Sequence, residues 1–168
     1  MKSMAQRRAF VQKLLIGVSV MHTGHVAWAT SVALLTTDSL PNALAKSLQA
    51  KQPLLVMVSL HGCPFCKLVR ENYLYPLLRD EGLQIVQVDM RDNRPIVDFD
   101  GSSTTQDAWI RKYGIRLAPT VLFFGSQGRE VAMRLKGAYL PDFYGAYLDE
   151  QLLVARKAVA TPKLSQNS

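Results

Sequence analysis

The two cysteines of this 168-residue chain, Cys63 and Cys66, lie in the segment "HGCPFCK" with two residues between them. Such a pair can be redox-active, can hold a metal ion, or can act as a small structural staple. A staple that closes so short a loop removes only about 2 kcal/mol of chain entropy. A metal site would be one ligand short, because the segment adds at most His61 to the two sulfurs, unless a second chain completes it. The spacing therefore favours a redox pair that needs no metal and no cofactor beyond its own disulfide.

The elements around the cysteines are expected to separate their roles. "PLLVMVSL" at 53–60 is a continuous apolar run, typical of a strand buried on both faces, and "PFCKLVRENYLYPLLRD" at 64–80 has the composition of a helix. Cys63 then lies at the N-terminus of the helix, where unpaired N–H groups and the helix dipole stabilise a thiolate. We expect Cys63 to be the nucleophile. Cys66, one turn inside the helix, should be more buried and should resolve the mixed disulfide.

The neighbours of the pair have two interpretations each. His61 would favour the Cys63 thiolate when it is protonated, or it is a solvated loop side chain. Lys67 would add positive potential, or it is an ordinary exposed lysine. Pro64 lacks an N–H group, and with Phe65 it should stiffen the turn between the sulfurs and so tune the reduction potential.

Helices and strands are predicted to alternate along the chain. We expect, in order, helix 41–50, the strand and helix described above, strand 83–90, an inserted loop or short hairpin at 91–105, helix 106–114, strands 119–125 and 129–138, and helix 141–157. This order predicts an α/β fold with a mixed central sheet flanked by helices on both faces.

Local signals set where these elements begin, bend and end. Small polar residues that favour helix starts, a proline inside a helix and a glycine in a tight turn are the main ones. The expected features are a cap at Asp38 or Ser39, a kink or break at Pro76, a cap at Thr104 or Thr105, a positive φ at Gly128, and apolar residues at helical spacing at Phe143, Tyr147, Leu148, Leu152 and Val154.

The N-terminal segment has the layout of a secretory signal peptide. It combines four basic residues and no acid, a short apolar run "LLIGVSVM", and the small-residue signature "AWA". The adjacent Arg7 and Arg8 also fit a twin-arginine export signal. The apolar run is well short of the roughly 20 residues that span a bilayer, so membrane anchoring is the less favoured alternative. We expect a periplasmic protein with a signal peptide at 1–29, one domain at 30–160 and a disordered tail at 161–168.

The basic charge of the chain belongs largely to this segment. The formal net charge is +7, and removal of residues 1–29 takes away four positive charges and no negative ones, which leaves +3. No cluster of Lys and Arg with interleaved aromatic residues remains for nucleic-acid binding, and no Gly-rich phosphate loop is present. We therefore expect no nucleic-acid partner.

The order of elements and the motifs "CPFCK", "KYGIRLAPTVLFF" and "REVAMRLKGA" resemble the thioredoxin family over about residues 39–156. The resemblance implies a thioredoxin fold with a cis peptide bond before Pro119 in "APT", which would shape the substrate groove and keep metals from the sulfurs. It also implies that the backbone of Ala118 pairs with an extended substrate segment and that Thr120 begins the central strand. The implied groove residues are Gly62, Pro64, Phe65, Ala118 and Thr120.

Within that family, "HGCPFCKLVRENYL", "VDFDG" at 97–101 and "KGAYLPDFYGAYL" look most similar to exported thioredoxin-like proteins of the SoxW type. This similarity implies a periplasmic thiol:disulfide oxidoreductase that takes electrons from a membrane thiol donor and reduces a disulfide-bearing envelope protein. We expect a monomer. The alternatives are a periplasmic oxidase or isomerase, or a non-catalytic module that binds a metal or cluster or acts like a chaperone.

Two positions depart from the pattern of cytosolic thioredoxins. Gly62 replaces the usual tryptophan before the first cysteine, which should leave Cys63 more open. Met57 replaces the buried acid six residues before that cysteine. Proton transfer to or from Cys66 would then need another route, and water or His61 is the one we expect.

Overall fold

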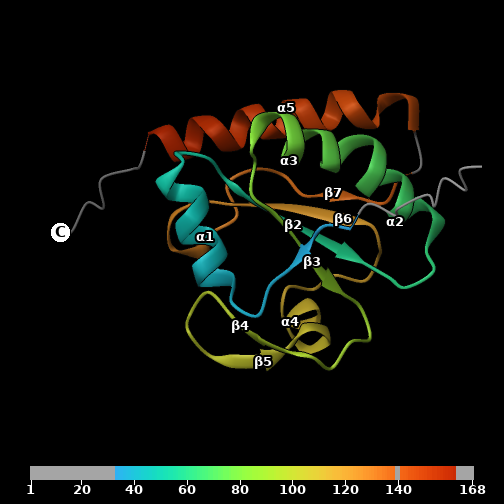
Figure 1. The fold of residues 1–168 in the computed structure, drawn as a ribbon, viewed down its shortest axis with the longest axis vertical. Helices are drawn as coiled ribbons and strands as arrows, with labels where there is room; N and C mark the ends of the chain where they lie inside the picture. Colours follow the sequence, from blue (N-terminus) through green and yellow to red (C-terminus); the bar gives the residue numbers. More distant parts are fainter. Residues whose placement is uncertain (1–32, 139–140, 162–168) are drawn as a thin grey trace, which may run out of the picture. The chain divides into compact units, whose positions relative to one another are not determined.

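The computed structural model of the chain describes residues 33–138 and 141–161 (Figure 1). The predicted signal peptide at 1–29 lies outside the described residues, and so does the predicted tail apart from Thr161. Among the helices of these two described ranges, none is long and apolar enough to cross a membrane.

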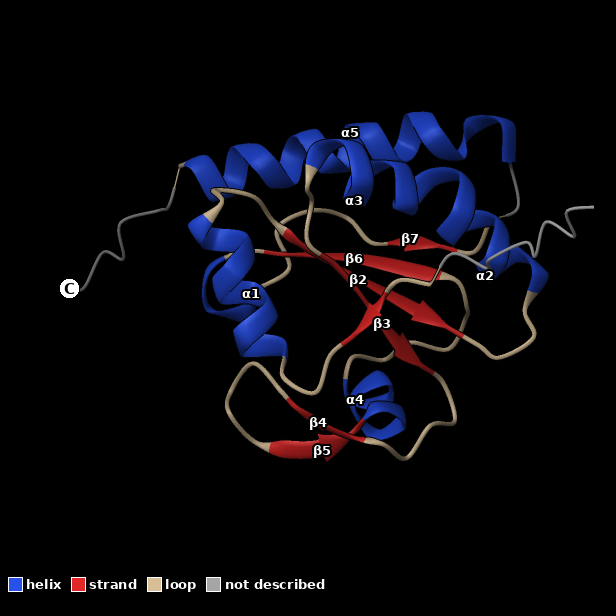
Figure 2. Ribbon diagram, viewed as in Figure 1, coloured by secondary structure: helices blue, strands red, loops and turns tan. Residues whose placement is uncertain are grey.

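The described strands and helices alternate as the sequence predicted (Figure 2). The strands are β1 (Leu35–Thr36), β2 (Leu54–Ser59), β3 (Ile85–Asp89), β4 (Pro95–Val97), β5 (Ser103–Thr105), β6 (Thr120–Phe124) and β7 (Leu135–Lys136). The helices are α1 (Leu40–Gln49), α2 (Pro64–Val69), a π-helical turn (Arg70–Leu74), α3 (Tyr75–Glu81), α4 (Gln106–Lys112), a 3-10 turn (Ser126–Gly128) and α5 (Pro141–Ala160). The predicted caps at Ser39 and Thr105 are confirmed, because their side chains accept the amide N–H groups of Asn42 and Ala108.

The central sheet is mixed, with the strand order β1-β3-β2-β6-β7. β2 runs parallel to β3 and antiparallel to β6, while β1 is parallel to β3 and β7 is antiparallel to β6. The predicted mixed sheet is therefore confirmed. β1 was not predicted, because its two residues are both exposed and carry no alternating pattern.

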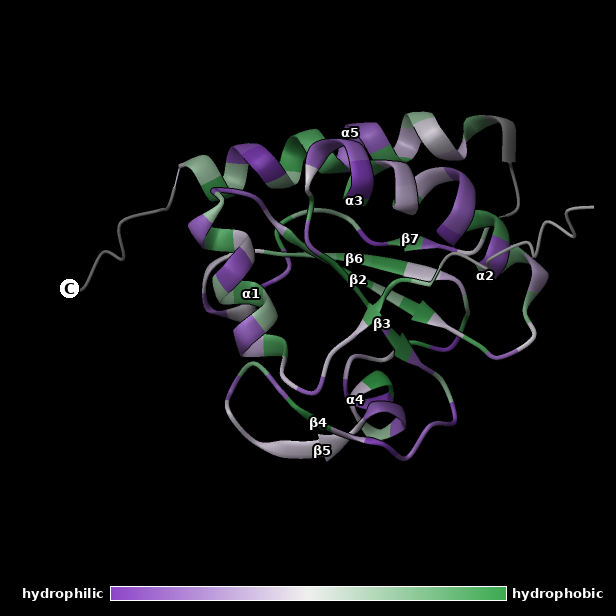
Figure 3. Cartoon of the chain, in the orientation of Figure 1, coloured by the Kyte–Doolittle hydropathy of each residue, from purple (hydrophilic) through white to green (hydrophobic). Residues whose placement is uncertain are grey.

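Helices cover both faces of the sheet, as predicted (Figure 1). Side chains of β2 alternate between the two cores: Leu55 and Met57 pack with α2, α3 and α5, while Leu54, Val56 and Val58 pack with α1 and α4. Figure 3 shows the central strands as apolar along their length, which suits a sheet buried on both sides. The end of β2 therefore enters the cysteine segment from a rigid, fully buried position.

The helix that follows the cysteines bends instead of breaking at Pro76. Pro76 has no N–H group, so it cannot donate to a carbonyl one turn earlier. The chain accommodates it with the π-helical turn, in which the N–H of Tyr75 donates to the carbonyl of Arg70, and Pro76 falls in the first turn of α3.

The inserted segment at 91–105 is a short hairpin, one of the two predicted forms. β4 and β5 pair antiparallel, and β4 also makes a bridge from Val97 to Ser39. Two residues of the segment, Ile96 and Asp98, are buried and join it to the core.

The predicted strand at 129–138 is mostly wrong. Only β7 and a single bridge from Glu130 to Phe124 pair with β6, and the residues between them leave the ladder. The backbone N–H of Met133 donates instead to the side chain of Gln151 on α5. Gly128 has the predicted positive φ, at 65°, and Gln127 beside it has a φ of 62°.

The buried face of α5 differs from the predicted apolar residues. Leu148 and Leu152 are buried, but Phe143, Tyr147 and Val154 are exposed. The helix buries Tyr144, Gln151 and Ala155 in their place. The apolar residues of α5 are too many for one stripe, so their spacing alone did not identify the side that meets the sheet.

Candidate active site

Cys63 lies at the N-cap position of α2, where the sequence placed it. Its backbone is extended, with φ −79° and ψ 114°, and its Sγ accepts the N–H of Cys66 at 3.2 Å. The residue is partly exposed. A sulfur held in this position is open to another molecule and takes up one of the free N–H groups of the first helical turn.

Cys66 is fully buried one turn further along α2, as predicted. Burial raises the pKa of its thiol to about 11, and the hydrogen bond with Cys63 acts in the same direction. Hydrogen bonds from the backbone of Leu60 and from the Ser59 hydroxyl lower the pKa and so partly oppose burial. Both cysteines are free thiols, and Cys66 keeps its proton at neutral pH.

The peptide bond between Ala118 and Pro119 is cis, as the sequence predicted. Pro119 is buried, and its carbonyl accepts the N–H of Gly137 at 2.7 Å. Ala118 and Cys63 are both partly buried and both pack against the core that contains Cys66. The fold therefore brings the cysteine segment and the loop before β6 to the same apolar cluster.

The other predicted groove residues divide into two groups. Gly62, Pro64 and Phe65 are exposed beside the cysteines, and 53% of Phe65 is accessible to solvent. Thr120 does begin β6, but it does not line the groove surface. Its side chain is buried, and its hydroxyl donates to the carbonyl of Leu117 at 2.7 Å. This hydroxyl closes the loop before the strand, which explains why it is unavailable to a substrate.

An open pocket of about 1070 Å³ lies on one side of Cys63. Its wall comes from the chain before α1, the cysteine segment, and the segment that follows β3. His61 and Lys67, the two predicted modulators, are exposed and both line this pocket. The lining carries both signs of charge, from Arg70, Arg91 and Arg94 and from Glu71, Asp89 and Asp92.

A chain of polar side chains behind the cysteines was missed by the sequence reasoning. Ser59 Oγ accepts Nη2 of Arg70 at 3.2 Å, and Nε of Arg70 donates to Oε1 of Gln87 at 2.9 Å. Nε2 of Gln87 then donates to Oδ1 of Asp89 at 2.7 Å. We refer to Ser59, Arg70, Gln87 and Asp89 as the Ser59–Arg70 network. Two signals were available in the sequence: Ser59 shares a strand face with Met57, and Arg70 lies one helical turn after Cys66.

Among the described residues, metal ligands do not gather at the cysteines. In the ranges that the structure describes, no group of three or more His, Cys, Asp or Glu side chains is arranged to hold a metal ion.

Comparison with known proteins identifies the family. The sequence model of the family described as "Thioredoxin-like domain" matches residues 40–152, more than half of the chain. The protein therefore belongs to the thioredoxin-like domain family. No curated protein matches it significantly.

Solved structures that resemble the chain include DsbH oxidoreductase, which is 17% identical with a TM-score of 0.50, over 90% of this chain and 95% of that chain. Thioredoxin O2 from Arabidopsis thaliana is 16% identical with a TM-score of 0.48, over 70% of this chain and 94% of that chain. Trxlp from Edwardsiella tarda EIB202 is 25% identical with a TM-score of 0.43, over 64% of this chain and 91% of that chain. The similarity to DsbH oxidoreductase supports the thioredoxin fold.

Proposed function

We propose that this protein is a thiol:disulfide oxidoreductase that reduces disulfides of other proteins through Cys63 and Cys66. The observation that carries the proposal is the unequal burial of the two thiols: Cys63 is partly exposed, whereas Cys66 is fully buried one helical turn further on. Disulfide exchange needs one sulfur that a substrate can reach and a second that can attack the first. Membership of the thioredoxin-like domain family supports the same class of reaction.

The reaction consists of two exchanges. The thiolate of Cys63 attacks one sulfur of the substrate disulfide, the substrate S–S bond breaks, and the other substrate sulfur leaves as a thiolate that takes a proton from water. Cys66 then loses its proton to water and attacks Sγ of Cys63. The mixed disulfide breaks, the second substrate sulfur leaves, and two electrons have passed from the protein to the substrate. A donor thiol must reduce the new Cys63–Cys66 disulfide before the next cycle.

Ala118 and Pro119 would guide the substrate to Cys63. The cis bond sets the direction of the chain just before β6, at the cluster that contains the cysteines. The backbone of Ala118 would pair with an extended substrate segment, and Gly62, Pro64 and Phe65 would form the exposed side of the groove. Binding through backbone groups suits a protein that acts on several disulfides, because it reads little of the substrate sequence.

The proposed place of action is the periplasm, and its basis is the export signal predicted in residues 1–29. The substrate would be a disulfide-bearing envelope protein, the electron donor would be a membrane protein thiol, and the mature protein would act as a monomer. Fractionation of cells that express the full chain tests the location. Recovery of a shortened protein in the periplasmic fraction is expected, and an intact chain in the cytoplasm would contradict it.

The test of the activity is reduction of insulin disulfides with dithiothreitol as the donor. We expect turnover by the wild-type protein, none by Cys63→Ser, and a trapped mixed disulfide with Cys66→Ser. Thr161→Ser, which also introduces a serine but at an exposed residue outside the site, is the control and should keep full turnover. Turnover by Cys63→Ser together with no trapped species in Cys66→Ser would overturn the assignment of the nucleophile.

The direction of the reaction is tested by the reduction potential. A strong oxidant is a pair whose reduced form is stabilised. The structure gives Cys63 Sγ the N–H of Cys66 as a donor, and Pro64 between them has no N–H to add. For the proposed reductase, equilibration with glutathione or dithiothreitol should give a value of about −270 mV, as for a thioredoxin, and a value of about −120 mV would make the protein a disulfide donor.

A further inference from the structure

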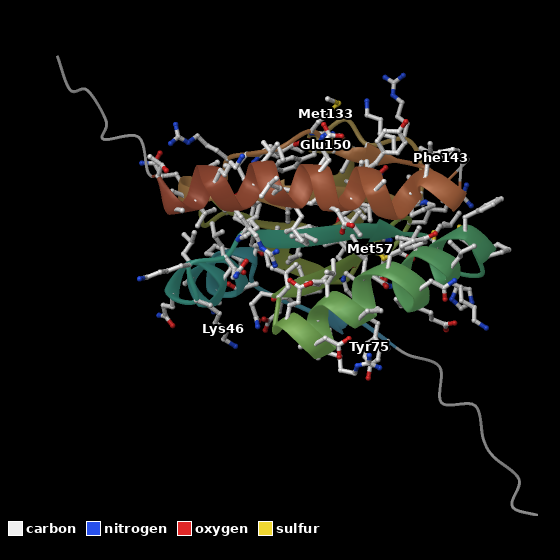
Figure 4. The ribbon with its side chains drawn as sticks, turned by 90° about the horizontal axis from the view of Figure 1, so that it is seen from above. Lys46, Met57, Tyr75, Met133, Phe143 and Glu150 are labelled. Carbon is white, nitrogen blue, oxygen red and sulfur yellow. The ribbon has the colours of Figure 1, made fainter. Side chains whose placement is uncertain are left out.

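The position where thioredoxins carry a buried acid is wholly apolar in this protein. Met57 is fully buried in the core that contains Cys66, and Figure 4 shows it between α5 and α2. It pairs across the sheet with Gln87 on β3 and Val121 on β6. No carboxylate is therefore available at this position to assist Cys66.

Ser59 lies beside Cys66, two residues after Met57 on β2. It lies on the same face of the strand as Met57, because side chains of a strand alternate. Its side chain is buried, with 1% of the residue accessible to solvent, and its hydroxyl hydrogen-bonds the Cys66 sulfur. Ser59 also lines the pocket beside Cys63. Ser59 thus lies between the buried thiol and the open pocket.

Arg70 holds the Ser59 hydroxyl from the other side. Its Nη2 donates to Ser59 Oγ at 3.2 Å and its Nε donates to Gln87 Oε1 at 2.9 Å, so two contacts fix the guanidinium. Because Ser59 Oγ accepts from Arg70, its own hydrogen is free to point at Cys66. Arg70 also lies one turn after Cys66, and its backbone N–H donates to the Cys66 carbonyl. A guanidinium keeps its charge at every relevant pH.

We propose that Ser59 and Arg70 stabilise the thiolate of Cys66 when it attacks the mixed disulfide, and so do the work of the missing acid. The proposal rests on the proposed function, because it concerns the second exchange. Ser59 is the group that touches the reacting sulfur. Arg70 is a positioning residue that polarises the hydroxyl, and Gln87 fixes the guanidinium.

The second exchange needs no reagent other than water. The Cys66 proton leaves to water in the pocket, because Arg70 is already protonated and a serine hydroxyl does not retain an extra proton. The Ser59 O–H then donates to the Cys66 thiolate. The thiolate attacks Sγ of Cys63, the bond between Cys63 and the substrate breaks, and the departing substrate thiolate takes a proton from water.

This route differs from the one through His61 that the sequence suggested. His61 is exposed and lines the pocket, and the hydrogen bonds that act on the Cys66 sulfur come from Cys63, Leu60 and Ser59. The titratable groups that face Cys66 are Cys63 on its own helix and Tyr144 on α5. The titratable and charged groups that line the adjoining pocket are His61, Lys67, Arg70, Glu71, Asp89, Arg91, Asp92 and Arg94. Burial raises the pKa of Tyr144, so this group stays neutral while Cys66 titrates.

The experiment measures the pH midpoint of Cys66 thiolate formation by absorbance at 240 nm, in a Cys63→Ser background that leaves one thiol. Ser59→Ala and Arg70→Gln are each expected to raise the midpoint by about one pH unit, which is a tenfold loss of thiolate at a fixed pH. Arg70→Lys should restore part of the shift, because it keeps the charge but loses the bidentate geometry. Arg79→Gln, an exposed cation on α3 that pairs with Asp80, is the control for net charge and should leave the midpoint unchanged.

Release of substrate from a preformed mixed disulfide, in protein with both cysteines, is the second readout. The pH at half-maximal release should rise by the same amount in Ser59→Ala, whereas a merely structural role would lower the rate at every pH alike. Unchanged midpoints in both Ser59→Ala and Arg70→Gln would overturn the proposal while insulin reduction by the wild type continued. Absence of insulin reduction by the wild type would instead overturn the proposed function, and the thiolate titration would still decide the role of Ser59 and Arg70.

Discussion

The indole N–H of Trp109 donates to Oδ1 of Asp98 at 2.9 Å, and both residues are buried. The same carboxylate accepts the backbone N–H of Phe99 at 2.7 Å and Nζ of Lys112 at 2.5 Å. Asp98 follows β4 and Trp109 lies on α4, so this carboxylate ties the inserted hairpin to the helix beside it. The hairpin is therefore part of the core of the domain.

Replacement of Asp98 by alanine should destabilise the protein by about 2–3 kcal/mol, because the buried N–H of Trp109 loses its acceptor. Urea unfolding followed by tryptophan fluorescence measures the change. Asp100→Ala is the matched control, since this exposed carboxylate also pairs with Lys112, and it should change stability far less. Equal effects of the two substitutions would show that the contact with Lys112, and not the one with Trp109, holds the hairpin.

Replacement of Gly128 by alanine tests the contact between the β6–β7 turn and the hairpin. Gly128 has a φ of +65°, and an added Cβ would lie 2.3 Å from Cβ of Phe99. We expect a loss of about 3 kcal/mol, from backbone strain and from overpacking together.

Gly82→Ala separates these two contributions. Gly82 also has a φ of +65°, but no atom lies within 4 Å of an added Cβ. It should therefore lose only the backbone part, about 1–2 kcal/mol in a thermal or urea melt. Equal losses of stability in Gly82→Ala and Gly128→Ala would contradict the overpacking contribution, because they would show that Phe99 can move away from the added Cβ at no cost.

The fold was largely predictable because each main element carries its own local signal. The apolar run that forms β2, the cap at Ser39 and the glycine turn at Gly128 act over a few residues, and all three are present. The errors lie where the structure of a segment depends on residues far away in the sequence. The N–H of Met133, in the predicted strand, donates to the side chain of Gln151 on α5 and not to β6. No local pattern in the predicted strand indicates this contact.

The same holds for the candidate active site: its local features were predictable and its long-range contacts were not. The spacing of Cys63 and Cys66 indicated their unequal burial, since the helix places them at its end and one turn inside it. The Ser59–Arg70 network was not predicted, because it joins β2, β3 and the π-helical turn across 11 and 17 residues of sequence. The spacing within the strand and within the helix places Ser59 and Arg70 on the side of the cysteines, but it cannot show that the two side chains meet. The assignment of His61 and Lys67 as modulators stays a prediction.

The pKa of Cys66 predicts how stability depends on pH. Burial raises this pKa from 9.0 to about 11 in the folded state, so the folded protein holds the thiol proton more tightly than the unfolded chain does. This contribution to stability is fully present below pH 9 and is lost as the pH rises toward 11. Urea unfolding of Cys63→Ser and of Cys63→Ser/Cys66→Ala should therefore give curves that diverge above pH 9, with the single variant losing more. Parallel pH profiles would contradict the raised pKa.

An acid restored at position 57 should harm the protein and not improve it. Met57 is fully buried among apolar residues, so Met57→Asp places a carboxyl group there without a partner, and we expect a loss of at least about 3 kcal/mol at pH 8. Burial raises the pKa of the new group above its unfolded value, so its stabilising protonated form is lost as the pH rises, and the destabilisation should be smaller at pH 5 than at pH 8. Met57→Leu, which conserves volume, should cost less than about 1.5 kcal/mol at both pH values. Equal stability of the two variants at pH 8 would contradict this prediction. It would show that a cation such as Arg70 can reach position 57, and Arg70 would then leave the contact with Ser59 that the second exchange is proposed to use.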